Sequence, residues 1–163
     1  MQIKLAGIIN ESIVDGPGIR TVLFTQGCSH NCFNCHNPAT HNPEGGRLYD
    51  IEDLCTDIIK NCRTKLITIS GGEPLQQHLQ LWVLTRLLKQ FDFNVWVYTG
   101  FTYEYIQQND WLKMSLDYID TIVDGPYIDS RRDLTLKFRG SNNQRIIDMR
   151  KSGKKLVEHQ IYY

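Results

Sequence analysis

Short apolar runs rich in β-branched and aromatic residues alternate, along most of the chain, with segments in which apolar residues recur at helical spacing. The runs predict strands at 2–9, 19–25, 65–70, 94–99, 118–123 and 144–148. Asp50 and Pro74 are typical of helix starts, and the helical segments lie at 50–62, 74–91 and 101–115. Such alternation favours a parallel sheet with right-handed crossovers. Because about five or six strands are too few for a closed eight-stranded barrel, we expect an α/β fold, an open partial (β/α) barrel of mainly parallel strands.

Polar or glycine-containing loops follow four of the predicted strands. "GCSHNCFNC" follows the run at 19–25, "SGGEP" the run at 65–70, "TG" the run at 94–99 and "DGPY" the run at 118–123. In open α/β sheets, ligands bind beyond the carboxyl ends of the strands. The sequence therefore predicts one functional site built from these loops.

Three cysteines with the spacing C-x3-C-x2-C, Cys28, Cys32 and Cys35, stand in the first of these loops. Three thiolates from one loop can hold three irons of a cubane cluster and leave the fourth iron open to another ligand. A zinc site of the Cys3His type is the alternative. Its fourth ligand would be one of the nearby histidines, His30, His36 and His41.

The glycine loop at 70–74 has two interpretations. Gly71 and Gly72 permit positive φ and close approach of a ligand to the backbone, and Glu73 adds an acceptor for a cationic group. A tight strand-to-helix turn without a ligand explains the same residues. The polar segment at 138–145 is either an exposed loop or a clamp for a carboxylate or ribose, with Arg139 and Arg145 as the charged groups.

Composition indicates one globular domain over residues 1–163, since the chain is 41% hydrophobic and 22% charged. Five cysteines, three of them tightly clustered, are typical of metal binding in a reducing compartment. We expect Cys55 and Cys62 in the core, since they share one apolar helix stripe. No run of about 18 apolar residues and no signal peptide is present, which favours a cytoplasmic protein without a membrane segment.

The formal net charge is zero, but basic residues are concentrated in one segment, residues 131–155. This segment is a solvated face, an anion site or a docking surface for an acidic partner. It lacks the aromatic residues typical of a nucleic-acid groove. Its nine basic residues are Arg131, Arg132, Lys137, Arg139, Arg145, Arg150, Lys151, Lys154 and Lys155.

The cysteine loop followed by "GGEP" resembles the signature of the radical S-adenosylmethionine (radical SAM) enzymes. Within that superfamily the chain is most similar to the activating enzymes of glycyl-radical proteins, in particular those of anaerobic ribonucleoside-triphosphate reductases. The segments that carry this resemblance span almost the whole chain: "DGPGIRTVLFTQGCSHNCFNCHNPAT", "ISGGEPLQQ", "VYTGFTYE", "IVDGPYI" and "FRGSNNQRIID". The resemblance implies a partial barrel of the radical SAM type.

The resemblance also implies residue roles. The cluster would be a [4Fe-4S] cluster on the three clustered cysteines, and the amino and carboxylate groups of SAM would chelate its open iron. The methionyl amino group would be received by Gly71, Gly72 and Glu73. Thr99 would contact the ribose or methionyl region. The adenine would pass the segment Asn34, Cys35 and His36, where the family often has an aromatic residue in place of Asn34, which favours backbone contacts here.

The implied reaction needs no side-chain acid or base, so no catalytic residue is expected beyond the cluster and SAM. A flavodoxin- or ferredoxin-like donor would supply one electron, and SAM would give methionine and a 5′-deoxyadenosyl radical. That radical would take hydrogen from a glycine of the reductase large subunit, the protein partner. Neither nucleic acid nor membrane is implied as a partner.

Three alternatives stay open from the sequence. The chain could activate another glycyl-radical enzyme, such as pyruvate formate-lyase. It could also be a small-molecule radical SAM enzyme of the queuosine-precursor type. A zinc-stabilised binding module without catalysis is the non-enzymatic alternative.

Overall fold

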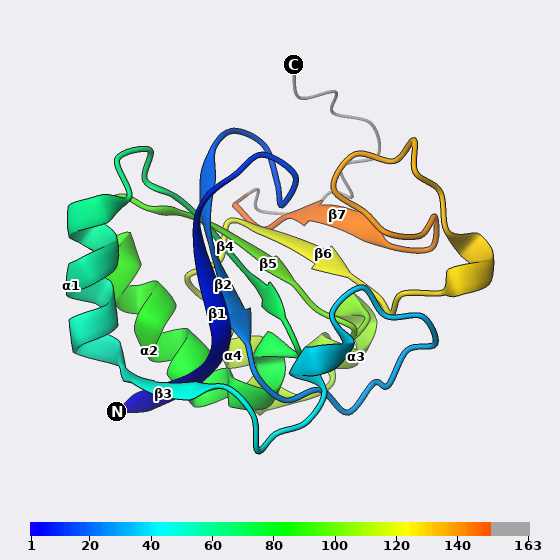
Figure 1. Cartoon of the computed structure of the whole chain (residues 1–163), viewed down its shortest axis with the longest axis horizontal. Coiled ribbons are helices and arrows are strands. Elements are labelled where there is room, and N and C mark those ends of the chain that lie inside the picture. Colours follow the sequence, from blue (N-terminus) through cyan, green and yellow to red (C-terminus); the bar gives the residue numbers. More distant parts are fainter. Residues whose placement is uncertain (151–163) are drawn as a thin grey trace.

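A single mixed sheet of seven strands organises the protein (Figure 1). The computed structural model describes residues 1–150. The strands lie side by side in the order β3-β1-β2-β4-β5-β6-β7. Their bounds are β1 Gln2–Ser12, β2 Arg20–Thr25, β3 Arg47–Asp50, β4 Leu66–Gly71, β5 Asn94–Tyr98, β6 Thr121–Asp124 and β7 Arg145–Asp148.

The four central strands, β2, β4, β5 and β6, are parallel, whereas β1, β3 and β7 run antiparallel to their neighbours. The predicted open, mainly parallel sheet is therefore confirmed, with one strand more than expected. β3 was not predicted because Arg47–Asp50 has no buried residue and no apolar run. Its pairing with β1 at Gln2–Leu5 depends on backbone hydrogen bonds, which residue type does not reveal.

Four α-helices connect the strands: α1 Ile51–Asn61, α2 His78–Lys89, α3 Tyr103–Gln107 and α4 Asp110–Met114. Asp50 is the N-cap of α1, as predicted, and its side chain accepts from the amide of Glu52 at 3.0 Å. Pro74 opens a 3₁₀ turn, η2 Pro74–Gln77, which leads into α2. The helix predicted at 101–115 divides because Asn109 caps a new helix, α4. In the part of the chain that the structure describes, no helix is long and apolar enough to cross a membrane.

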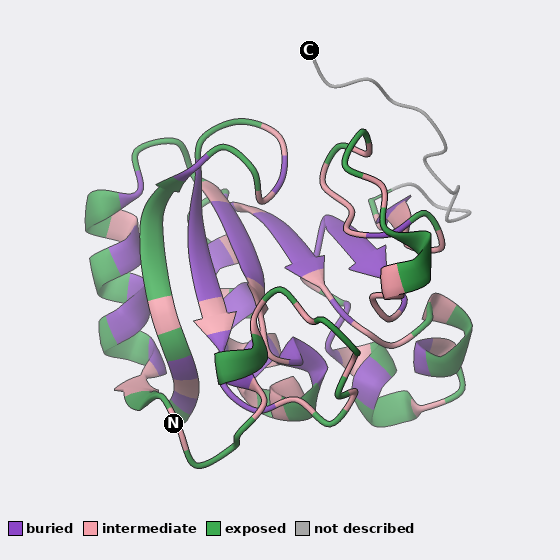
Figure 2. Ribbon diagram, turned by 45° about the vertical axis from the view of Figure 1, so that its right-hand side comes forward, coloured by how far each residue is buried: buried purple, intermediate pink, exposed green. Residues whose placement is uncertain are grey.

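The helices cover one face of the sheet. Consecutive parallel strands with right-handed crossovers place their helices on the same face, and α1 and α2 lie side by side there (Figure 1). Burial is concentrated in the central strands (Figure 2). The core between sheet and helices includes Leu23, Ile69, Val97 and, as predicted, Cys55 and Cys62. Burial raises the pKa of the Cys55 thiol to about 11.

A buried arginine, Arg20, links neighbouring strands near the amino ends of the parallel strands. It is 1% exposed, and its Nε donates to Thr68 Oγ1 at 2.7 Å. Its Nη2 donates to the carbonyl of Ile67 at 2.6 Å and to both oxygens of Asn94. The guanidinium also lies 5.8 Å from the ring centroid of Trp96. Burial lowers the pKa of Arg20 to about 10, and its hydrogen bonds tie together β2, β4 and β5.

Candidate functional site: a three-cysteine pocket at the carboxyl ends of the strands

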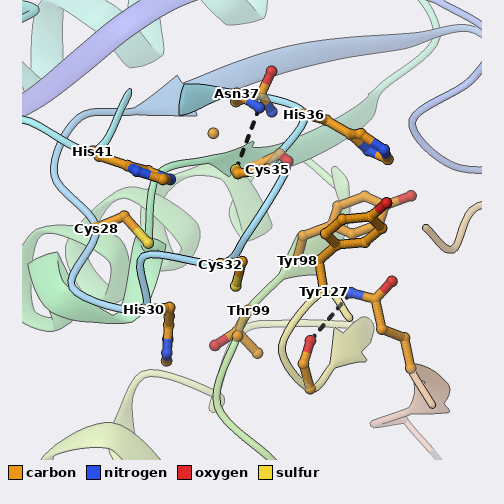
Figure 3. Close-up of a pocket in the computed structure, with 16 residues that line it drawn as sticks. Cys28, His30, Cys32, Cys35, His36, Asn37, His41, Tyr98, Thr99 and Tyr127 are labelled. Atoms are coloured by element: carbon orange, nitrogen blue, oxygen red, sulfur yellow. Dashed lines mark hydrogen bonds between the residues drawn. The ribbon is translucent and has the colours of Figure 1, made fainter. Parts of the chain in front are cut away.

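The loops that follow β2, β4, β5 and β6 line one open pocket, as the sequence predicts (Figure 3). Its volume is about 650 Å³, including solvent in its mouth. All three clustered cysteines reach it. The lining residues are Cys28, His30, Cys32, Cys35, His36, Asn37, His41, Ser70, Gly71, Gly72, Tyr98, Thr99, Gly100, Gly125, Tyr127 and Gln144.

Two asparagines give the cysteine loop its shape. Asn31 and Asn34 have φ of 51° and 53°, in the left-handed region that asparagine tolerates better than most residues. Asn34 is the third residue of a turn closed by the amide of Cys35 and the carbonyl of Cys32 at 3.2 Å. This position favours Gly or Asn. The side chain of Asn34 donates to Asp129 Oδ2 at 3.2 Å and does not line the pocket, so Asn34 shapes the loop.

Backbone amides surround the three sulfurs. The amide of Asn37 donates to Cys35 Sγ at 3.4 Å. Burial raises the pKa of Cys28 and of Cys32, against the lowering effect of backbone amides of His30 and Asn31 at Cys28 and of Tyr127 at Cys32. N–H groups aimed at sulfur are one of the means by which proteins stabilise iron–sulfur clusters and set their potentials.

The arrangement of donors bears on the choice between zinc and a cluster. Within residues 1–150, no group of three or more His, Cys, Asp or Glu side chains gathers closely enough to hold a single metal ion. A tetrahedral zinc site requires such a gathering. A cubane cluster binds each thiolate through a different iron, so its three sulfurs stand apart around one cavity. The donor set fits the cluster better.

The three histidines considered as a fourth zinc ligand lie in different surroundings. His30 Nε2 lies 2.8 Å from Glu73 Oε2. The ring of His36 lies against that of Tyr127, with centroids 4.7 Å apart. His41 Nε2 is buried and has no hydrogen-bond partner among residues 1–150, and its ring extends toward the pocket beside Cys28 (Figure 3). Because buried polar atoms are normally satisfied, His41 points to a group that binds in this cavity.

Glycine is required at 71 and 72 by close backbone approach. Gly71 has φ of 99°, and a Cβ there would lie 2.6 Å from the amide nitrogen of Thr25. A Cβ on Gly72 would lie 2.3 Å from the carbonyl oxygen of Gly27. Both glycines line the pocket, so this wall is backbone, which a ligand can approach closely.

Glu73 lies behind that wall. Its side chain is fully buried and accepts four hydrogen bonds. Oε1 accepts from the amide of Leu75 and from Thr99 Oγ1, each at 2.9 Å. Oε2 accepts from the amide of Gly100 at 2.8 Å and pairs with His30. A carboxylate has about four lone-pair sites, and Glu73 is not among the lining residues.

Two arginines expected near the site are engaged elsewhere. Arg145 pairs with Asp124 and with Glu104, whose pKa it lowers to about 2. Arg139 Nη1 donates to the carbonyl of Gln144 at 3.0 Å. Neither arginine lines the pocket, which argues against the alternative in which the two clamp a ligand there.

Some lining residues had no role predicted from the sequence. Tyr127 and Gln144 line the pocket from segments that had been noted only as motifs, "DGPY" and "FRGSNNQR". Tyr98 ends β5, and its hydroxyl donates to the carbonyl of Phe138 at 3.1 Å. Of the basic segment, Arg131, Arg132 and Lys137 are exposed, whereas Lys151, Lys154 and Lys155 lie outside the described residues.

Comparison with known proteins gives consistent matches. Residues 14–147 match the model of the family described as "4Fe-4S single cluster domain". The chain is similar to the anaerobic ribonucleoside-triphosphate reductase-activating protein of Enterobacteria phage T4, with 36% identity over 82% of this chain and 86% of the relative. The proteins of the same name from Vibrio cholerae and Escherichia coli K12 are 34% and 33% identical. They cover 81% and 85% of this chain and 89% and 94% of their own lengths.

Proposed function

The chain belongs to the family of anaerobic ribonucleoside-triphosphate reductase-activating proteins, and on that premise we propose that it generates the glycyl radical of such a reductase. It is a radical SAM enzyme with a 4Fe-4S cluster domain. The observation that carries the proposal is the meeting of three thiols and the glycine loop in one pocket. We further propose that the chain forms one radical SAM domain and works in the cytoplasm, where thiols stay reduced.

Cys28, Cys32 and Cys35 would each hold one iron of the cluster, and the backbone amides around them would stabilise the sulfur charge. When bound, the reduced cluster supplies the electron that cleaves SAM into methionine and a 5′-deoxyadenosyl radical. The chain's own residues position and shield the reactants. His41 Nε2, which has no partner within the described residues, would hydrogen-bond to the bound cofactors.

The SAM contacts would come from the opposite wall. Gly71 and Gly72 present backbone to the methionyl amino group, and Thr99 stands beside them in the lining. Cys35 and His36 supply the wall along which the adenine would lie, and the ring of His36 is supported by Tyr127. Glu73 and Asn34 lie outside the lining, so their effect on SAM would be indirect.

The reductase would dock on the lip of the pocket. Phe33 is 75% exposed on the cysteine loop, and Leu134 is 83% exposed on the segment after β6. Arg131, Arg132 and Lys137 are exposed on that same segment. Apolar and basic side chains together suit an acidic partner surface with an apolar anchor. A flavodoxin- or ferredoxin-like protein would supply the electron.

The test is activation of the reductase. Reduced, cluster-loaded protein with SAM should give the reductase a glycyl radical that electron paramagnetic resonance detects. Pyruvate formate-lyase offered in its place should remain inactive. Activation of pyruvate formate-lyase but not the reductase would move the assignment to another glycyl-radical partner.

Docking has a separate test. Charge reversal at Arg131, Arg132 and Lys137 should weaken binding to the reductase, most strongly at low salt, while uncoupled SAM cleavage is retained. Reversal at exposed Lys60, on α1, is the matched control and should leave binding unchanged. Equal affinity for both variants would remove the basic segment from the interface.

A further inference from the structure

We propose that His30 and Glu73 form a clamp that holds the cysteine loop in the shape the cluster needs, so that Glu73 is a positioning residue and not a contact for the SAM amino group. The inference deepens the proposed function and rests on it, since it takes the three cysteines as the cluster ligands. It begins from the place of His30, midway between Cys28 and Cys32. Contacts that hold this side chain therefore restrain the backbone between the two thiols.

His30 is fixed from three directions. Its Nε2 bonds to Glu73 at 2.8 Å, and its ring meets Phe101 edge-on with centroids 4.6 Å apart. Gly100 closes the third side, since a Cβ there would lie only 2.4 Å from His30 Cδ2. These three contacts restrict the rotamers of His30, and in our proposal they hold the loop in shape for the cluster.

Glu73 is in turn fixed by the ends of two strands. It caps η2 through the amide of Leu75, after β4, and it accepts from Thr99 and the amide of Gly100, after β5. The Glu73–His30 bond extends this network to the loop after β2. One carboxylate therefore joins three of the four loops that line the pocket.

The same network argues against a direct role of Glu73 in binding SAM. Its acceptor sites are filled, its side chain is fully buried, and it lies behind the pocket wall. An ammonium group could reach it only by displacing one of these donors, which would leave a buried polar group unpaired.

The experiment separates cluster retention from SAM affinity. We would reconstitute wild type, His30→Ala, His30→Gln and Glu73→Gln anaerobically, then measure iron loss to a chelator, the cluster's reduction potential and the SAM dissociation constant. His78→Ala is the matched control, since His78 begins α2 outside the pocket lining. Thermal unfolding of each apoprotein reports any general loss of stability.

We expect His30→Ala and Glu73→Gln to lose iron about ten- to a hundredfold faster than wild type, as supporting residues of metal ligands typically do. His30→Gln keeps an N–H donor for Glu73 and should recover most of this retention. The potential should shift in His30→Ala, because the buried charge of Glu73 loses its partner, whereas a merely structural role would leave it unchanged. In each variant, the SAM dissociation constant of the cluster-loaded fraction should equal that of wild type.

Normal iron retention in His30→Ala would overturn the clamp. Weakened SAM binding in Glu73→Gln with a normal cluster would return Glu73 to the SAM site. Failure of the wild type to take up iron would refute the proposed function instead, so the two failures are distinguishable.

Discussion

Replacing Gly72 with alanine tests whether the glycine loop of the pocket wall lies in close contact with the neighbouring backbone. The added Cβ would lie 2.3 Å from the carbonyl oxygen of Gly27 and 3.1 Å from that of Thr25. Neither can move freely, because the amide of Gly72 donates to Thr25 and the amide of Glu73 donates to Gly27, each at 2.8 Å. Overpacking a rigid site costs about 1–3 kcal/mol, and contact with backbone places this site in the upper part of that range. No positive φ is involved at Gly72, so the cost is steric.

For a chain of this length, about 2–3 kcal/mol corresponds to a fall in Tm of about 4–12 °C. The assay is anaerobic thermal unfolding of the apoprotein, with urea unfolding to obtain the free energy. Gly7→Ala is the matched control, because a Cβ there meets nothing within 4 Å. It should be neutral or stabilise slightly, by up to about 1 kcal/mol. Equal stability of the two variants would refute the close-approach account of the glycine loop.

Three further predictions concern groups outside the cofactor pocket. Arg20→Leu leaves Thr68, the side-chain oxygen of Asn94 and three backbone carbonyls without their donor, and should lower the free energy of unfolding in urea by about 3 kcal/mol or more. A loss below about 1 kcal/mol would contradict this. Glu104→Gln should cost only about 0.5 kcal/mol near neutral pH, because the ion pair with Arg145 is exposed. Since the pKa of Glu104 is lowered from 4.5 to about 2, the stability that wild type has over Glu104→Gln is complete above pH 4.5 and disappears as the pH falls toward 2. A stability difference that stays constant down to pH 2 would refute this prediction. Burial raises the pKa of Cys55 to about 11, so iodoacetamide at pH 8 should modify it last in the folded apoprotein, as mass spectrometry would show; modification as fast as that of the pocket cysteines would be the contrary result.

Local sequence patterns predicted which strands and loops form the site. The apolar runs located six of the strands, and the motifs after β2, β4, β5 and β6 do line one pocket. This succeeded because parallel strands bring their carboxyl ends to one edge, so order along the chain determines proximity in space. Cys55 and Cys62 were separated from the three pocket cysteines by helical periodicity alone.

Roles that depend on long-range hydrogen bonds could not be predicted. Glu73 has the residue type of an acceptor for a ligand, but His30 and Thr99, 43 and 26 positions away, occupy it. Arg145 likewise has the charge to hold a carboxylate, but Asp124 and Glu104 supply its carboxylates. The sequence displays donors and acceptors, whereas only the fold shows which of them are already satisfied.

The most direct test of the central claim is formation of 5′-deoxyadenosine. Protein reconstituted anaerobically with iron and sulfide, then given dithionite and SAM, should produce it. Cys28→Ala, Cys32→Ala and Cys35→Ala should each abolish the product, while Cys62→Ala, which alters a core cysteine outside the pocket, should retain it. Stoichiometric zinc without a cluster, and no 5′-deoxyadenosine from the wild type, would contradict the account.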